Sequence, residues 1–146
     1  MPQSAALAVA IFNASDDTVE MLSVILAHRG YRPLSGHADQ VKSGELDFIR
    51  FLAEQRPDAI IWDIAPPYDR NWHFFKLLRE VGPLEHRPIV LTTTNKKHLD
   101  ALVGQDTAAI EIVGKPYDLE AIVDAVTRAL ASRKKAGPRQ FGEGRD

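Results

Sequence analysis

Short apolar runs alternate with segments of helical periodicity along this chain of 146 residues, and this alternation constrains the fold more than any other feature. The clearest runs are residues 7–12 and 59–64, and each is continuous enough to form a strand buried on both faces. Strands that alternate with helices form a parallel sheet covered by helices on both sides. The pattern therefore predicts an α/β fold of five βα units around a five-stranded, doubly wound parallel sheet.

The remaining elements follow from weaker signals of the same kind. Further strands are expected at residues 31–34, 88–92 and 109–113, and helices at residues 15–30, 46–55, 72–81, 96–103 and 119–130. We expect one domain over residues 1–131, because no internal repeat or second apolar core is evident. Residues 132–146 are basic and rich in Gly, which predicts a disordered tail too short to fold into an output domain.

Composition excludes several classes of protein. The absence of Cys removes disulfide frameworks, thiolate zinc sites and Cys nucleophiles. A formal net charge of −2 shows no global basic field, so we expect no nucleic-acid partner. No run approaches the ~18 apolar residues of a membrane span, and the N-terminus lacks the Lys or Arg that opens a secretory signal. We therefore expect a cytoplasmic protein with no membrane partner.

Polar side chains at the ends of the predicted strands are the candidates for chemistry, because sites in open α/β sheets form outside the carboxyl ends of the strands. Asp63 is the most informative, since a carboxylate within an apolar strand must reach solvent or carry a desolvation cost. Thr93 ends the fourth predicted strand and Lys115 follows the fifth. Each of these residues has an ordinary structural explanation when taken alone. Their order along the chain is what indicates a functional site.

Taken together, these residues resemble the receiver domain of two-component response regulators, a flavodoxin-like fold. In that family the phosphoacceptor Asp is followed four residues later by Pro, as Asp63 is by Pro67. Thr93 matches the hydroxyl residue after the fourth strand, and 115–117 match a Lys-Pro-aromatic motif. Gly30 and Tyr31 match the pair that ends the first helix. The resemblance covers residues 5–131, within which residues 37–44 look like an insertion.

The resemblance implies a signalling domain and no enzyme of its own. Asp63 would accept a phosphoryl group from a sensor histidine kinase or a phosphotransfer protein, Lys115 would supply a fixed cation, and Thr93 would follow the phosphoryl group. A Mg²⁺ ion would be held by Asp63 and the backbone carbonyl of Ala65. The fourth helix, fifth strand and last helix would form a face for a homodimer or a downstream protein partner.

The match fails at the end of the first strand, where the family places two acidic residues that hold Mg²⁺. Asn13 and Ala14 occupy these positions, so Asn13 offers a neutral oxygen and Ala14 offers no ligand atom. Asp16 is an alternative ligand, although Asp16 and Asp17 are better interpreted as first-turn residues of the first helix. Weakened or absent Mg²⁺ binding is therefore expected.

Two alternatives remain open at this stage. The first is a degenerate pseudo-receiver that binds partners without phosphorylation, which the Asn13 and Ala14 positions favour. The second is a small flavodoxin-like ligand-binding domain, which is disfavoured because the chain has no Gly-x-Gly-x-x-Gly or P-loop pattern.

Overall fold

The computed structural model describes residues 6–13, 15–36, 47–80, 87–104, 110–114 and 119–140, with the side chains of residues 110–114 and 132–140 excepted. Within these ranges the chain alternates strands and helices in the order expected. The insertion at residues 37–44 and the Lys-Pro-aromatic motif at residues 115–117 lie outside the described residues.

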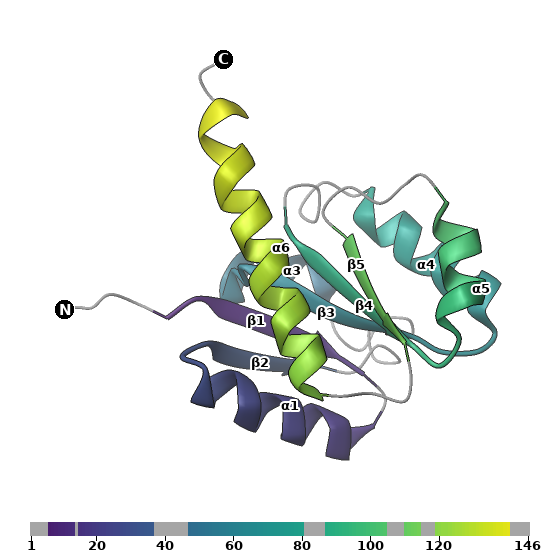
Figure 1. The fold of residues 1–146 in the computed structure, drawn as a ribbon, viewed down its shortest axis with the longest axis horizontal. Helices are drawn as coiled ribbons and strands as arrows, with labels where there is room; N and C mark the ends of the chain where they lie inside the picture. Colours follow the sequence, from purple (N-terminus) through teal and green to yellow (C-terminus); the bar gives the residue numbers. More distant parts are fainter. Residues whose placement is uncertain are drawn as a thin grey trace.

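Five parallel strands form one sheet in the order β2-β1-β3-β4-β5 (Figure 1). The strands are β1 (Ala8–Phe12), β2 (Arg32–Gly36), β3 (Ala59–Ile64), β4 (Ile89–Thr93) and β5 (Ile110–Gly114). All four neighbouring pairs are parallel, so their carboxyl ends lie along the same edge. This strand order is the flavodoxin-like one, and the predicted doubly wound fold is confirmed.

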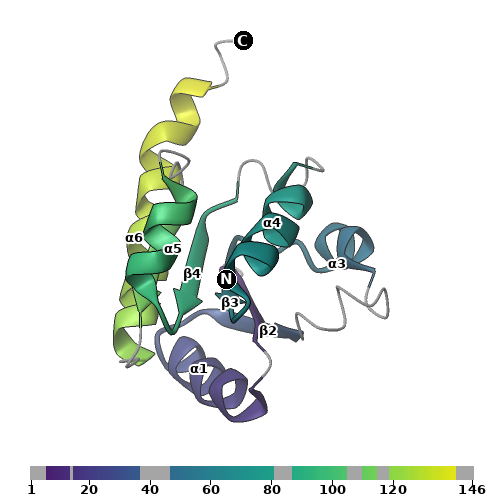
Figure 2. The ribbon, with the colours of Figure 1, turned by 90° about the vertical axis from the view of Figure 1, so that its right-hand side faces the viewer.

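Helices cover both faces of the sheet. They are α1 (Asp16–His28), α3 (Phe48–Gln55), α4 (Tyr68–Arg79), α5 (Lys96–Val103) and α6 (Leu119–Gln140). Figure 2 shows α3 and α4 on the side of the sheet away from α6. Between α1 and α6, the Arg29 guanidinium hydrogen-bonds Glu120 and lies 2.9 Å from an Asp124 oxygen; these hydrogen bonds raise the pKa of Arg29 above its ordinary value.

The two faces of the sheet bury different kinds of side chain. The α1 and α6 face is aliphatic, built from Val9, Ile11, Ala59, Ile61 and Val90 of the sheet with Leu22, Leu26, Ile122, Val123, Ala125, Val126 and Leu130. The opposite face is rich in aromatic residues, among them Phe12, Phe48, Trp62, Trp72 and Phe75. The expectation that Trp62 belongs to the core is confirmed, because 1% of it is exposed.

Two helix boundaries differ from those expected. α4 begins at Tyr68, four residues before the expected residue 72, because Pro67 occupies the N-cap position and the polar residues after it form an exposed first turn. α6 continues past the expected end of the domain at residue 131 to Gln140, so the tail expected to be disordered from residue 132 begins as helix. The stretch after Ser132 is rich in Lys and Arg, which are good helix formers that favour a helix C-terminus.

Candidate functional site

The carboxyl ends of β1 and β3 lie next to each other at the point where the strand order reverses. Phe12 of β1 is paired with Trp62 of β3, so the next residues along the two strands, Asn13 and Asp63, lie at neighbouring positions on this edge of the sheet. In doubly wound sheets the crevice at such a switch point is where ligands bind. The residues that the sequence singled out on β1 and β3 are therefore brought to one edge of the sheet.

Asp63 lies on β3 between two buried apolar residues and is itself partly exposed. Trp62 and Ile64 both pack into the aromatic core, so strand alternation turns Asp63 toward the other face. Thr92 is directly opposite Asp63 in the β3–β4 register, and its hydroxyl donates a hydrogen bond to Asp63 Oδ1 at 2.6 Å. The site thus contains a carboxylate oriented by a hydroxyl from the next strand.

Thr93, the residue whose hydroxyl is expected to follow the phosphoryl group, faces the opposite side of the sheet from Thr92. It is fully buried, and its Oγ1 accepts a hydrogen bond from the backbone N–H of Asn95 at 3.3 Å. In this structure the hydroxyl in contact with Asp63 is therefore that of Thr92, because alternation along β4 places Thr92 and Thr93 on opposite faces. A role for Thr93 in following a phosphoryl group stays a prediction.

The first turns of α4 and α5 are tied together beside these strand ends. The Tyr68 hydroxyl forms a short hydrogen bond with Thr94 Oγ1, and His98 Nε2 lies 3.0 Å from Asp69 Oδ1. The rings of Tyr68 and His98 are also in contact, with centroids 5.3 Å apart. These contacts hold Thr94 and the start of α5 against the first turn of α4.

The loop after β1 is organised by capping side chains. Asn13 is 7% exposed, and its Oδ1 accepts a hydrogen bond from the Ser15 N–H at 2.8 Å. Ser15 is the N-cap of α1 and accepts in turn from the Thr18 N–H at 3.2 Å. Asp16 is exposed in the first turn of α1, as is Asp17, where their charges favour the helix N-terminus. Asn13 therefore serves the turn that starts α1.

The turn between β3 and α4 contains a contact that the sequence did not suggest. Asn71 Nδ2 donates a hydrogen bond of 2.7 Å to the backbone carbonyl of Ala65, and both residues are partly buried. The Asn71 backbone N–H also bonds the Pro67 carbonyl at 3.1 Å, as part of the first turn of α4. The peptide bond between Pro66 and Pro67 is cis. The Ala65 carbonyl, expected as a metal ligand, thus has a side-chain partner from the same turn.

These donors do not fit a Mg²⁺ ion well. Of the predicted ligands Asp63, Asn13, Ala65 and the alternative Asp16, only the two Asp residues carry charge. Asp63 is also the residue expected to react, and Asp16 lies in the exposed first turn of α1, so its role as a ligand stays a prediction. The Asn13 and Ala65 oxygens already accept hydrogen bonds from Ser15 and Asn71. Within the described residues no three His, Cys, Asp or Glu side chains are grouped so that they could hold a metal ion. Mg²⁺ gives up its hydration water only for strong, near-octahedral oxygen ligands.

Two of the predicted positions lie outside the described residues. They are Lys115, expected to supply a cation, and Ala14, which stands where the family has an acidic residue. Their roles stay predictions.

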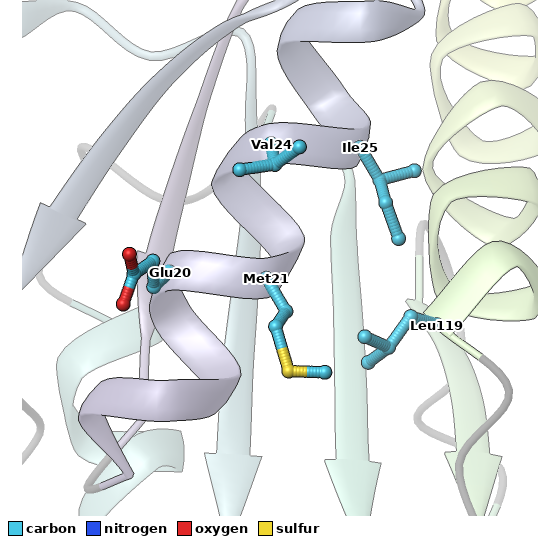
Figure 3. A pocket seen from close by; sticks show the side chains of 5 residues that line it. All are labelled: Glu20, Met21, Val24, Ile25 and Leu119. Atoms are coloured by element: carbon cyan, nitrogen blue, oxygen red, sulfur yellow. The ribbon is translucent and has the colours of Figure 1, made fainter.

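Elsewhere on the surface, Met21, Val24 and Ile25 of α1 and Leu119 of α6 line a shallow apolar hollow beside Glu20 (Figure 3). Its only ionisable side chain is Glu20, so it offers little for chemistry. Among the helices of the described residues, none combines the length and apolar character that crossing a bilayer requires.

Two site residues, Thr92 and Asn71, were missed by sequence reasoning. Thr92 would have followed from the β3–β4 register, since the residue paired with Asp63 must share its face of the sheet. Asn71 precedes the helix expected at residues 72–81, and only the earlier start of α4 at Tyr68 turns its side chain back toward Ala65.

No protein-family model matches the chain. The transcriptional regulatory protein AfsQ1 of Streptomyces coelicolor is 31% identical over 119 residues, which cover 81% of this chain and 48% of that protein. The phosphate regulon regulatory protein PhoB of Klebsiella pneumoniae is 28% identical over 115 residues, 77% of this chain and 48% of PhoB. The chain thus spans about half the length of these curated relatives.

Solved structures show the same fold over nearly their whole length. The chemotaxis protein CheY4 of Vibrio cholerae aligns with a TM-score of 0.64 and 25% identity, covering 86% of this chain and 99% of CheY4. A response regulator receiver protein from Sinorhizobium medicae aligns with a TM-score of 0.60 and 20% identity, covering 88% and 97% of the two chains.

Proposed function

The chain belongs to the receiver-domain family of two-component response regulators, and from that premise we propose that it accepts a phosphoryl group on Asp63 and signals through protein–protein contacts. The observation that carries the proposal is the placement of Asp63, a partly exposed carboxylate at the carboxyl end of β3 that accepts a hydrogen bond from Thr92. The resemblance to the family supports the same residue, because Asp63 is followed four residues later by Pro67.

The chemistry is a transfer between two nucleophiles. A carboxylate oxygen of Asp63 attacks the phosphorus of a phosphohistidine on a sensor histidine kinase or phosphotransfer protein. An O–P bond forms to Asp63 as the P–N bond of the donor breaks, and the electron pair returns to the imidazole nitrogen, which takes up a proton. The Thr92 hydroxyl holds one carboxylate oxygen in place, and Lys115 would balance the phosphoryl charge.

The partners follow from the same proposal. The donor is a kinase or phosphotransfer protein, and the recipient of the signal is a protein that recognises the phosphorylated form. We propose that α5, β5 and α6 provide the face for that partner or for a second copy of the chain. On this proposal the protein works in the cytoplasm, has no catalytic turnover of its own, and needs neither membrane nor nucleic-acid contact.

Incubation with acetyl phosphate tests the acceptor role without knowledge of the natural kinase. We expect the intact mass to rise by one phosphoryl group and borohydride reduction to mark Asp63. The Asp63→Asn variant should show no increase, whereas Asp69→Asn, which removes an exposed carboxylate at the start of α4, should be modified normally. Failure to form the adduct, or an adduct that persists in Asp63→Asn, would refute the acceptor role.

A second candidate function is a pseudo-receiver that binds its partner without phosphorylation. It is favoured by the hydrogen bonds that the Asn13 and Ala65 oxygens already make, which leave few ligands for a cation that would assist transfer. The same experiment separates the two: no adduct from acetyl phosphate or from a panel of purified histidine kinases would favour the pseudo-receiver.

A further inference from the structure

The backbone carbonyl of Ala65, which the family resemblance assigns to a cation, accepts a hydrogen bond from a side chain. Asn71 Nδ2 lies 2.7 Å from the Ala65 carbonyl oxygen, at the short end of the range of N–H···O hydrogen bonds. Ala65 follows Asp63 by two residues, so whatever fixes its carbonyl also fixes the direction in which the chain leaves the reactive carboxylate.

Asn71 itself is held firmly enough to do this. It lies in the first turn of α4, where its backbone N–H bonds the Pro67 carbonyl, and the next residue, Trp72, is 6% exposed in the aromatic core. Trp72 in turn contacts Phe75 with ring centroids 6.2 Å apart. The packing of α4 against the sheet therefore fixes the position from which the Asn71 amide reaches Ala65.

The amide differs from a metal ion in charge. A carbonyl oxygen has two lone pairs, so the hydrogen bond from Asn71 does not by itself exclude a cation. It does satisfy a partly buried acceptor without a charged ligand. At the neighbouring strand end, Asn13 adds no charge, and its oxygen accepts a hydrogen bond from Ser15. A neutral donor can thus hold the turn where the carboxylates for a cation are missing.

We propose that Asn71 is a positioning residue that takes the place of a divalent cation at the Ala65 carbonyl, so that the Asp63 site keeps its geometry without metal. The inference concerns the site of the proposed function and rests on Asp63 being its reactive group. It does not need phosphorylation to be observed, and its tests therefore use protein without any phosphoryl donor.

The first test is titration of the wild-type protein with MgCl₂, with MnCl₂ as a paramagnetic probe, followed by NMR. The reporters are the Ala65 carbonyl carbon and the Asn71 side-chain amide. We expect no saturable shift with millimolar Mg²⁺ and no selective broadening of residues 63–65 by Mn²⁺. Trp62 precedes Asp63 and Trp72 follows Asn71, so Trp fluorescence should also stay constant. A saturable response in these signals would overturn the proposal.

The second test exchanges the neutral amide for a charge of nearly the same shape. Asn71→Asp removes the N–H donor and sets a carboxylate beside the Ala65 carbonyl, so a cation is needed to join them. We expect this variant to gain a saturable Mg²⁺ response in the millimolar range, and the double variant with Asp63→Asn to respond at least tenfold more weakly. If the NMR signals of Asn71→Asp show no saturable response to Mg²⁺, as in the wild type, the Asn71 amide does not take the place of a cation.

A third variant keeps the proposal testable if the added charge prevents folding. Asn71→Ala removes the donor alone, and we expect the Ala65 carbonyl shift to move while Mg²⁺ still has no effect. His73→Ala is the matched control, because His73 is exposed on the same helix, and it should leave the Ala65 signal unchanged. An unchanged Ala65 signal in Asn71→Ala would show that Asn71 does not position this carbonyl.

Discussion

The ends of β1 and β3 are neighbours in the sheet, yet their polar residues serve different purposes. At the end of β3, Asp63 keeps a partly exposed carboxylate, and the neighbouring strand supplies the Thr92 hydroxyl that orients it. At the end of β1, Asn13 is buried and its oxygen accepts from the Ser15 N–H at the start of α1. The two strand ends therefore differ in what their polar side chains do: the end of β3 presents a charged group to solvent, and the end of β1 uses a neutral side chain to build the turn into α1.

We expect the greatest difference between the two strand ends in phosphoryl acceptance. Asp63→Asn should abolish phosphoryl acceptance, because an amide oxygen is far too weak a nucleophile, whereas Asn13→Ala should retain the greater part of it. The measurement is intact mass after a fixed time with acetyl phosphate. Equal losses in both variants would mean that the end of β1 takes part in the chemistry, contrary to the comparison.

Removal of the Trp62 side chain, which packs between β1 and β3, should destabilise the ends of both strands. Trp62 of β3 packs against Phe12 of β1 with ring centroids 5.1 Å apart, and 1% of Trp62 is exposed. Trp62→Ala should lower the free energy of unfolding by about 3–5 kcal/mol, the usual cost of a large buried cavity. Urea denaturation followed by circular dichroism measures the loss. Leu77→Ala, at a residue 53% exposed on α4, serves as the control and should cost far less.

Replacement of the hydroxyl that contacts Asp63 tests how the β3 end is built. Thr92→Val keeps the shape of a residue that is 1% exposed but removes the donor to Asp63, and a hydrogen bond to a charged group contributes ~1.5–3 kcal/mol. We expect Thr92→Val to lower the free energy of unfolding by about 1.5 kcal/mol, near the lower limit of this range, because Asp63 is partly exposed. Thr93→Val should cost less, since Thr93 Oγ1 accepts a longer, 3.3 Å bond. Urea denaturation measures both losses. A larger loss of stability in Thr93→Val than in Thr92→Val would show that the Thr93 hydroxyl contributes more to stability at this strand end.

The smallest effect concerns the turn at the end of β1. Asn13→Ala removes the acceptor for the Ser15 N–H and should cost about 1 kcal/mol of stability, as the loss of a capping side chain does. Asn13→Asp keeps an acceptor oxygen near the N-terminus of α1 and should be close to neutral. Thermal unfolding of both variants checks the order. A greater loss in Asn13→Asp than in Asn13→Ala would contradict a purely structural role for Asn13.

The general fold could be predicted from sequence because its signals are local and repeated. Apolar runs such as residues 59–64 mark strands buried on both faces, and the helix-period segments between them require parallel pairing. Ser15 was recognisable as the start of α1 from its residue type and the acids that follow it. Asp63 could be found for the same reason, since a single carboxylate in such a run is conspicuous.

The contacts that the sequence did not predict depend on geometry between elements. Thr92 is next to Asp63 only through the register of two strands that are 29 residues apart along the chain. The Asn71 amide reaches Ala65 only because α4 starts at Tyr68, earlier than its apolar pattern indicates. α6 continues to Gln140 through residues whose polar composition gives no apolar stripe. Periodicity carries no information about these placements, and the extension of α6 follows from helix propensity and not from an apolar stripe.

The rate of Asp63 phosphorylation in the presence and absence of divalent cation measures whether the site works without metal. Wild-type protein is incubated with acetyl phosphate in EDTA and, in parallel, in an excess of MgCl₂, and intact mass is followed over time. We expect adduct in both samples with rates that agree within about twofold, because Asn71 holds the turn beside Asp63 without metal. A rate at least tenfold higher with Mg²⁺, or adduct formed only in its presence, would contradict this expectation.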